Sequence, residues 1–177
     1  TLFRSYTDFI AHRFTTAALI AALDHKERTG QGQYIDISQF EAAVQYFGPE
    51  VLDYSVNGNI PTRAGNADPV AAPHAAYPCV GEDRWIAIAI ESDHEWRIFK
   101  EKMGNPAWAE DAKFATLSTR KENEDELNQQ VAEWTSGWHN KELQYFLQPD
   151  IATGAVQDQS DLYEDAQTLN RGYFVDL

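Results

Sequence analysis

The segment from Asn57 to Pro73 most constrains the fold, because it divides the 177-residue chain into two parts. It contains no aromatic residue. The residues in it that break regular structure are Gly58, Pro61, Gly65, Pro69 and Pro73. Glycine and proline at this density are typical of linkers and loops. We therefore expect one part over residues 1–56, a linker over residues 57–73 and a second part over residues 74–177.

The part before the linker has the pattern of a helix, a strand and a second helix. Residues 9–28 carry apolar side chains at helical spacing, and Gly30 follows as a helix C-cap. Residues 34–37, Tyr-Ile-Asp-Ile, alternate as in a short strand. Ser38 with Glu41 three residues later is the pattern of a capping box, which predicts a helix running to about Tyr54.

The part after the linker has the pattern of a mixed α+β domain. Residues 75–80 and 84–90 predict a β-hairpin joined through residues 81–83. The elements expected next are a helix from Ser92 to Gly104, a helix over residues 122–137, a helix capped by Asn140, and a strand over residues 154–157. The predicted fold class is therefore α/β or α+β, in two parts.

Charge and cysteine content restrict the partners and the compartment. The net charge is −14 and the sequence pI is about 4.6, so nucleic acid and anionic membranes are unfavourable partners. The apolar run over residues 17–23 is too short to span a bilayer. Cys79 is the single cysteine, which excludes an internal disulfide and fits a reducing cytoplasm. We expect a cytoplasmic protein in which Cys79 is a small buried residue.

The most specific sequence pattern starts at Asp8, continues through a helix, and ends in a polar motif. That motif is His25-Lys26-Glu27-Arg28-Thr29-Gly30-Gln31-Gly32-Gln33, followed by Tyr34-Ile35-Asp36-Ile37-Ser38. Further landmarks follow in order at residues 72–74, 77–79, 83–89, 105–108 and 172–175. In this order and spacing the chain resembles the class III CoA-transferases, also called the CaiB/BaiF family.

The resemblance implies a nucleophile and a covalent mechanism. In the family, an aspartate one helix upstream of the Thr-Gly pair is the nucleophile, and Asp8 lies 21 residues before Thr29. The implied chemistry is acyl transfer through an aspartyl mixed anhydride and an aspartyl-CoA thioester. The substrates would be an acyl-CoA and a small carboxylic acid, with no permanently bound cofactor. From the residues alone, an aspartate just before an apolar helix is read as an N-cap, and it is the resemblance that favours the nucleophile.

The resemblance also implies how the chain is organised. Residues 1–56 would be a piece of the Rossmann-like large domain, and residues 74–177 would be the small domain. Family members form interlocked homodimers, so we expect a homodimer. The chain starts without Met, and residues 173–177 read as an interrupted strand. We therefore expect an internal fragment that is inactive by itself, and we assign no residue to CoA binding.

Two further residues are candidates for contact with the substrate. His74 follows the linker, although a packed or turn-bound histidine is the alternative. Glu91 matches a position where racemases of the same fold keep a glutamate, although a solvated or capping residue is the alternative. Gly65-Asn66 is followed by Ala67 rather than by the glycine run of formyl-CoA transferases, which argues against oxalate as acceptor.

Other functions stay open at this point. An acyl-CoA racemase would use Asp8 as an acid/base at the α-carbon, and a non-catalytic interaction module would use no nucleophile. Asp93, His94 and Glu95 have the side chains of a metal site, but consecutive residues on a helix point to different faces. We expect no metal site.

Overall fold

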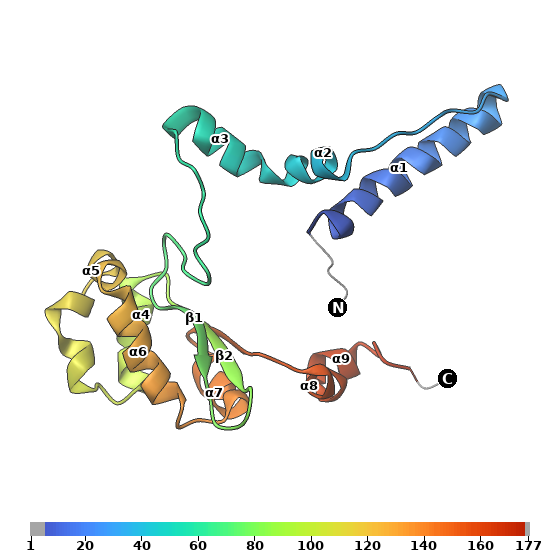
Figure 1. Ribbon diagram of the computed structural model, residues 1–177. Helices are drawn as coiled ribbons and strands as arrows, with labels where there is room; N and C mark the ends of the chain where they lie inside the picture. Colours follow the sequence, from blue (N-terminus) through green and yellow to red (C-terminus); the bar gives the residue numbers. More distant parts are fainter. Residues whose placement is uncertain (1–5, 176–177) are drawn as a thin grey trace. The chain divides into compact units, whose positions relative to one another are not determined.

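The computed structural model describes residues 6–175, and the chain divides into two compact units, Thr1–Arg63 and Ala64–Leu177 (Figure 1). The division falls inside the glycine- and proline-rich segment over residues 57–73.

The first unit is helical. Its elements are α1 (Tyr6–Thr29), α2 (Gln39–Val44), the 3-10 turn η1 (Gln45–Phe47) and α3 (Gly48–Asn57). Gly30 ends α1 with a φ of 74°, as predicted, because glycine adopts the left-handed region without a Cβ clash. The hydroxyl of Ser38 caps α2 by accepting the backbone N–H of Glu41 at 3.2 Å. The expected single helix to Tyr54 is broken at η1, and Pro49 lies in the first turn of α3, where its missing N–H is tolerated.

The predicted strand over residues 34–37 is wrong. Residues 31–38 have no regular secondary structure, and Tyr34 is 92% exposed. A strand needs a neighbour to pair with its backbone N–H and C=O groups. The described residues of the first unit provide no such neighbour.

The first unit buries very little apolar surface. Among its described residues, the buried apolar side chains are Ala11, Ala42 and Ala43. Large apolar side chains of α1 are instead exposed, including Phe9, Leu19, Ile20 and Leu23. Exposed apolar surface on this scale is typical of a face that another protein segment covers.

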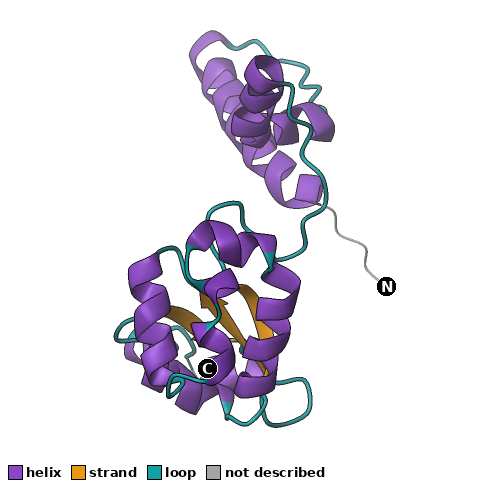
Figure 2. Cartoon of the chain, turned by 90° about the vertical axis from the view of Figure 1, so that its left-hand side faces the viewer, coloured by secondary structure: helices purple, strands orange, loops and turns teal. Residues whose placement is uncertain are grey.

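The second unit is built on an antiparallel sheet of order β1-β2-β3. Its strands are β1 (His74–Pro78), β2 (Trp85–Ala89) and β3 (Ala152–Ala155). The predicted hairpin is confirmed, with Ala76 opposite Ala87. The last strand starts two residues earlier than predicted and pairs with β2 through Ile88 and Thr153. Figure 2 shows these short strands among the helices of the unit.

The helices of the second unit are mostly short. They are α4 (Asp93–Lys102), α5 (Leu117–Glu122), α6 (Glu124–Thr135), α7 (Asn140–Leu147), α8 (Gln159–Glu164) and α9 (Ala166–Asn170), with 3-10 turns η2 (Ala107–Glu110) and η3 (Ala112–Phe114). The helix expected from Ser92 is confirmed, and Ser92 is its N-cap through a reciprocal pair of hydrogen bonds with Glu95. Residues 173–175 form no strand, and the end of the expected interrupted strand, residues 176–177, lies outside the described residues.

The sequence predicted Asn140 as the N-cap of α7, and this prediction is wrong. His139 occupies the N-cap position, and Asn140 is the first helical residue. The side-chain amide of Asn140 donates to the backbone carbonyl of Trp85 at 3.3 Å. Because Asn140 is buried, its amide must find partners inside the protein, and it joins α7 to the sheet.

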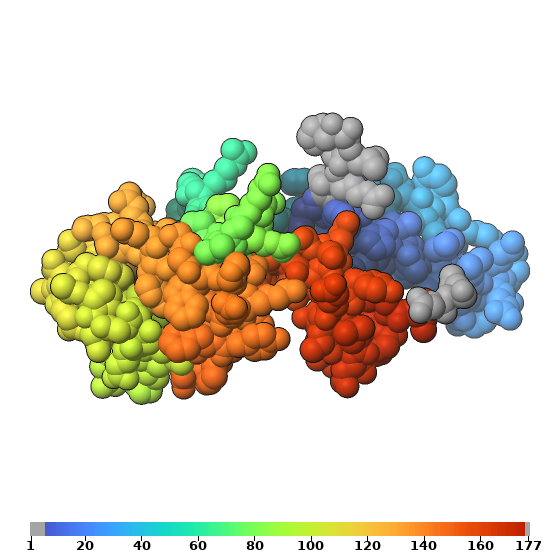
Figure 3. Space-filling model, turned by 90° about the horizontal axis from the view of Figure 1, so that it is seen from below, coloured from blue at the N-terminus to red at the C-terminus, as the bar shows by residue number. Residues whose placement is uncertain are grey.

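The core of the second unit covers one face of the sheet. Tyr77, Ile86 and Ile88 point into it and meet helix residues. Those helix residues are Trp96, Phe99, Leu127, Val131, Leu143 and Leu147. In Figure 3 the hairpin (green) lies against α6 and α7 (orange). Cys79 is buried in this core as expected, and burial raises the pKa of its thiol to about 11.

Candidate active site

Asp8 is the third residue of α1 and is exposed. The alternative role of Asp8 as an N-cap is wrong, because α1 already includes Tyr6 and Thr7. The positive end of the helix dipole lies at this first turn and attracts negatively charged groups. Ionisation is what a carboxylate nucleophile requires.

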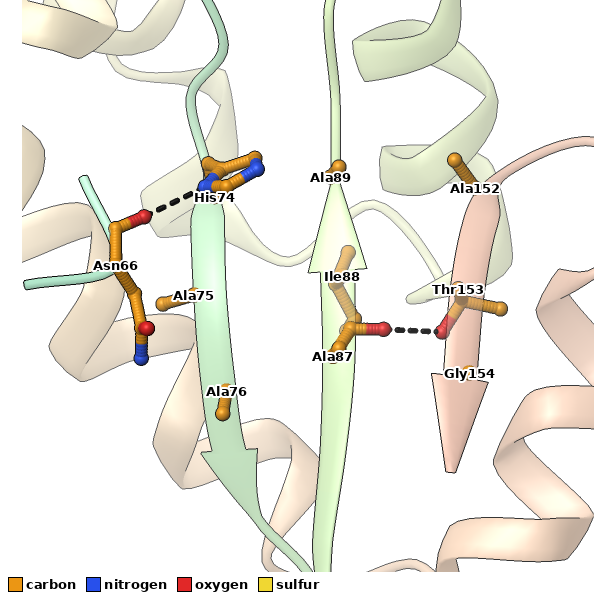
Figure 4. A pocket seen from close by; sticks show the side chains of 10 residues that line it. All are labelled: Asn66, His74, Ala75, Ala76, Ala87, Ile88, Ala89, Ala152, Thr153 and Gly154. Carbon is orange, nitrogen blue, oxygen red and sulfur yellow. Dashed lines mark hydrogen bonds between the residues drawn. The ribbon is translucent and has the colours of Figure 1, made fainter. Parts of the chain in front are cut away.

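His74 is the first residue of β1, and its ring is fixed from one side. The distance from its Nδ1 to the backbone carbonyl oxygen of Asn66 is 2.6 Å (Figure 4). Since a carbonyl oxygen can only accept, Nδ1 carries the hydrogen. In the neutral ring, Nε2 is therefore the hydrogen-bond acceptor.

Glu91 lies just after β2, at the same end of the hairpin as His74. Pairing continues beyond the strands there, because the N–H of Ile90 donates to the carbonyl of Pro73 at 3.0 Å. The backbone N–H of Glu91 donates to the side chain of Glu95 at 2.8 Å, and the side chain of Glu91 is exposed. The structure thus brings His74 and Glu91 to one end of the sheet, while Asp8 belongs to the other unit.

A hollow of about 320 Å³ lies over the sheet next to His74 (Figure 4). Small residues form its floor: Ala76, Ala87, Ala89, Ala152 and Gly154. The pairing of the three strands puts Ala76, Ala87 and Gly154 side by side on the face of the sheet that is turned away from the core. His74 and Asn66 form its rim. Sequence reasoning missed Asn66 and this floor, although alanines at alternate positions were a usable signal.

Arg120 fixes the backbone that leads into His74. Its side chain is fully buried, and its Nε donates to the backbone carbonyl of Ala72 at 2.8 Å. Its guanidinium also pairs with Asp93 at 3.0 Å and lies over the ring of Trp96. Burial lowers the pKa of Arg120 against the opposing effect of Asp93. Nothing in the sequence pattern distinguished this arginine.

Within residues 6–175, no group of three or more His, Cys, Asp or Glu side chains is placed to hold a metal ion. The helices of the same residues are all too short or too polar to cross a membrane.

The sequence profile of CoA-transferase family III matches residues 3–177. The chain belongs to CoA-transferase family III. A solved CaiB/BaiF family protein from Brucella suis has the same fold, with a TM-score of 0.83 and 26% identity over 99% of this chain and 46% of that chain. The mixed α/β class predicted from the sequence is therefore confirmed.

Relatives of this family III chain include named enzymes. A probable CoA-transferase of Mycobacterium tuberculosis is 33% identical over 97% of the chain and 22% of that protein. The succinyl-CoA:mesaconate CoA-transferase of Haloarcula hispanica is 28% identical over 96% of the chain and 42% of that protein. The family III chain thus spans less than half the length of these relatives.

Proposed function

We propose that Asp8 is the covalent acyl carrier of a CoA-transferase that moves CoA from an acyl-CoA to a free carboxylic acid. The observation that carries this proposal is the position of Asp8. It is an exposed carboxylate in the first turn of a 24-residue helix, in a chain of CoA-transferase family III.

The reaction proceeds by alternating attack at carbonyl carbons. The Asp8 carboxylate attacks the donor thioester, the C–S bond breaks, and CoA leaves as a thiolate with an aspartyl mixed anhydride remaining. The thiolate then attacks the aspartyl carbonyl, releasing the donor acid and leaving an aspartyl-CoA thioester. The acceptor carboxylate attacks that thioester, and the thiolate released attacks the acceptor carbonyl of the new anhydride. Asp8 is regenerated as a carboxylate, and no proton or electron is consumed.

The substrates and the assembly of the whole protein are proposals, the substrates from the names of the relatives and the assembly from the family resemblance. The named relatives include a succinyl-CoA:mesaconate and a succinate–glutarate CoA-transferase, so we propose an acyl-CoA and a small carboxylic acid as substrates. We also propose a cytoplasmic homodimer, with residues 1–56 in a large domain and residues 74–177 in a small domain. Because the chain spans less than half of its relatives, we expect it to be inactive by itself.

Trapping of the acyl-enzyme tests the nucleophile. The complete protein encoded by the gene is incubated with acyl-CoAs and hydroxylamine, and the peptide that contains Asp8 is analysed by mass spectrometry. We expect a hydroxamate at Asp8, and we expect Asp8→Asn to lower the transfer rate by about 10⁴-fold or more, as for loss of other catalytic nucleophiles. Asp24→Asn is the matched control, since Asp24 is also exposed on α1 and pairs with Arg28.

Two outcomes would overturn the proposal. One is the absence of a hydroxamate at Asp8 with every thioester tried, combined with full activity of Asp8→Asn. The other is exchange of the α-hydrogen of the acyl group in D₂O without CoA transfer, which would indicate the racemase.

A further inference from the structure

The hollow on the open face of the sheet has no part in the function proposed above. Its floor is the row of alanine and glycine residues on β1, β2 and β3. The hydroxyl of Thr153 donates to the carbonyl of Ala87 at 2.8 Å and is thereby occupied. The polar groups of the rim are the imidazole of His74 and Asn66 (Figure 4).

We infer that this hollow binds the uncharged acyl group of one of the two substrates, and that it favours a short acyl chain carrying a hydroxyl. The inference rests on the proposed function and deepens it, because it names a substrate class for one subsite. This substrate class differs from the dicarboxylic acids that appear in the names of several relatives.

The size of the hollow selects the acyl end of the substrate. Small-molecule sites in proteins generally have volumes of about 300–1,000 Å³, and the hollow, at about 320 Å³, is at the lower limit. At about 30 Å³ for each water-sized group, it has room for about ten non-hydrogen atoms, which is enough for a short acyl chain but not for the nucleotide part of CoA. The hydrocarbon would rest on the methyl groups of Ala76, Ala87 and Ala89, where apolar contact is favourable.

The charge of the hollow selects against a second carboxylate. Among the described residues that line it there is no lysine and no arginine. A carboxylate placed on the alanine floor would lose water without gaining a cationic partner, which is costly. An acyl group whose far end is uncharged avoids this cost.

The fixed ring of His74 selects a hydrogen-bond donor. Its Nδ1–H is used by the carbonyl of Asn66, so Nε2 of the neutral ring accepts. In Figure 4 the second ring nitrogen points away from Asn66, over the gap between β1 and β2. A hydroxyl on the acyl chain can donate to this nitrogen, whereas a carboxylate or a bare methylene cannot.

Binding of simple thioesters to the 177-residue chain tests this inference. The probes are acetyl, butyryl, 3-hydroxybutyryl and succinyl thioesters of N-acetylcysteamine, titrated at pH 8 while alanine methyl signals are followed by NMR. We expect shifts of the Ala76, Ala87 and Ala89 methyls, with affinity rising about fourfold for each added methylene. The hydroxyl should add about fivefold, and the succinyl thioester should bind at least about tenfold more weakly than butyryl.

Variants separate the floor from the rim. Ala87→Leu places a larger side chain on an exposed floor position and should abolish binding, whereas Ala115→Leu, at an exposed alanine outside the hollow, should not change it. His74→Phe keeps a planar ring of similar size but has no ring nitrogen that could accept a hydrogen bond. It should retain butyryl binding and lose the fivefold hydroxyl preference.

Several results would overturn the inference. They are succinyl binding as tight as butyryl binding, a hydroxyl preference that persists in His74→Phe, or unchanged binding in Ala87→Leu. The Asp8→Asn chain separates this inference from the proposed function. Suppose that the alanine methyl signals still shift in the Asp8→Asn chain, and that the complete protein with Asp8 in place forms no adduct on it. Only the role of Asp8 as nucleophile would then be refuted. An adduct on Asp8 without methyl shifts would refute only the hollow.

Discussion

Arg120 shows how single residues hold the second unit together. A charged side chain with no exposed surface needs close hydrogen-bond partners, and Arg120 has them for Nε and Nη1, while Nη2 is buried without one among the described residues. Here the partners are the carbonyl of Ala72, at 2.8 Å, and the carboxylate of Asp93, at 3.0 Å. The residue therefore joins α5 both to the start of α4 and to the segment that ends at His74.

Replacing Arg120 by Met should destabilise the second unit by about 3 kcal/mol, because the carbonyl of Ala72 would stay buried without a donor. Arg120→Lys should recover only part of this loss, since an ammonium lacks the planar fork of the guanidinium. Urea unfolding followed by tryptophan fluorescence measures the change. Arg97→Ala, at an exposed arginine on α4, should change stability by less than about 0.5 kcal/mol. Equal effects at the two positions would contradict the assigned role.

At the scale of elements, α8 is attached to the rest of its unit mainly through charged side chains. Asp161, the buried residue of α8, pairs with Arg84 from the turn before β2 and with Lys141 of α7 at 2.7 Å. Asp158 adds a second ion pair to Arg84 at 3.1 Å. Hydrogen bonds from Lys141 and from the backbone N–H of Asp158, with the nearby Arg84, lower the pKa of Asp161 to about 2.

Asp161→Asn should loosen α8, because the neutral amide cannot replace two ion pairs. We expect severalfold faster amide hydrogen exchange over residues 159–164 at pH 7, with the sheet unchanged, whereas Asp125→Asn, at an exposed residue of α6, should not affect α8. Since the folded-state pKa lies below the unfolded value of about 4, the stabilisation is present above that value. It should be lost as the pH falls toward 2. Equal protection of α8 in Asp161→Asn and the parent chain would contradict this anchoring.

At the scale of the whole molecule, the two units differ in how much apolar surface they bury. The second unit has a continuous core, whereas the described part of the first unit buries three alanines and exposes large side chains along α1. A helix of this kind is stabilised by whatever covers its apolar side.

We expect the chain to self-associate at micromolar concentrations through the first unit. Leu19 and Leu23 lie one turn apart on α1 and are each about half exposed. Replacing both with Glu should shift the sedimentation coefficient toward that of a monomer. Tyr145→Glu, at an exposed apolar position of the second unit, should leave the association unchanged. A chain that sediments as a monomer before any substitution would contradict this expectation.

Local signals in the sequence determined the elements that depend on neighbouring residues. The hairpin, the cap at Ser92, the end of α1 at Gly30 and the cap at Ser38 all rest on hydrogen bonds or backbone conformations within a few residues. Residues 34–37 failed as a strand because a strand depends on a distant partner that periodicity cannot supply. Asn140 was misassigned because its amide serves the sheet rather than its own helix.

The sequence by itself identified Asp8, His74 and Glu91 as candidates, since they lie in a motif or beside recognisable elements. The tertiary structure alone decided that alanines from three strands form one floor, that Asn66 fixes the ring of His74, and that Arg120 secures the segment before it. Asn66 and His74 are eight residues apart, whereas the other contacts join residues farther apart in the chain and depend on how the strands pair. The alternate alanines are a local trace of the floor in the sequence, but strand pairing decides which residues come together on it.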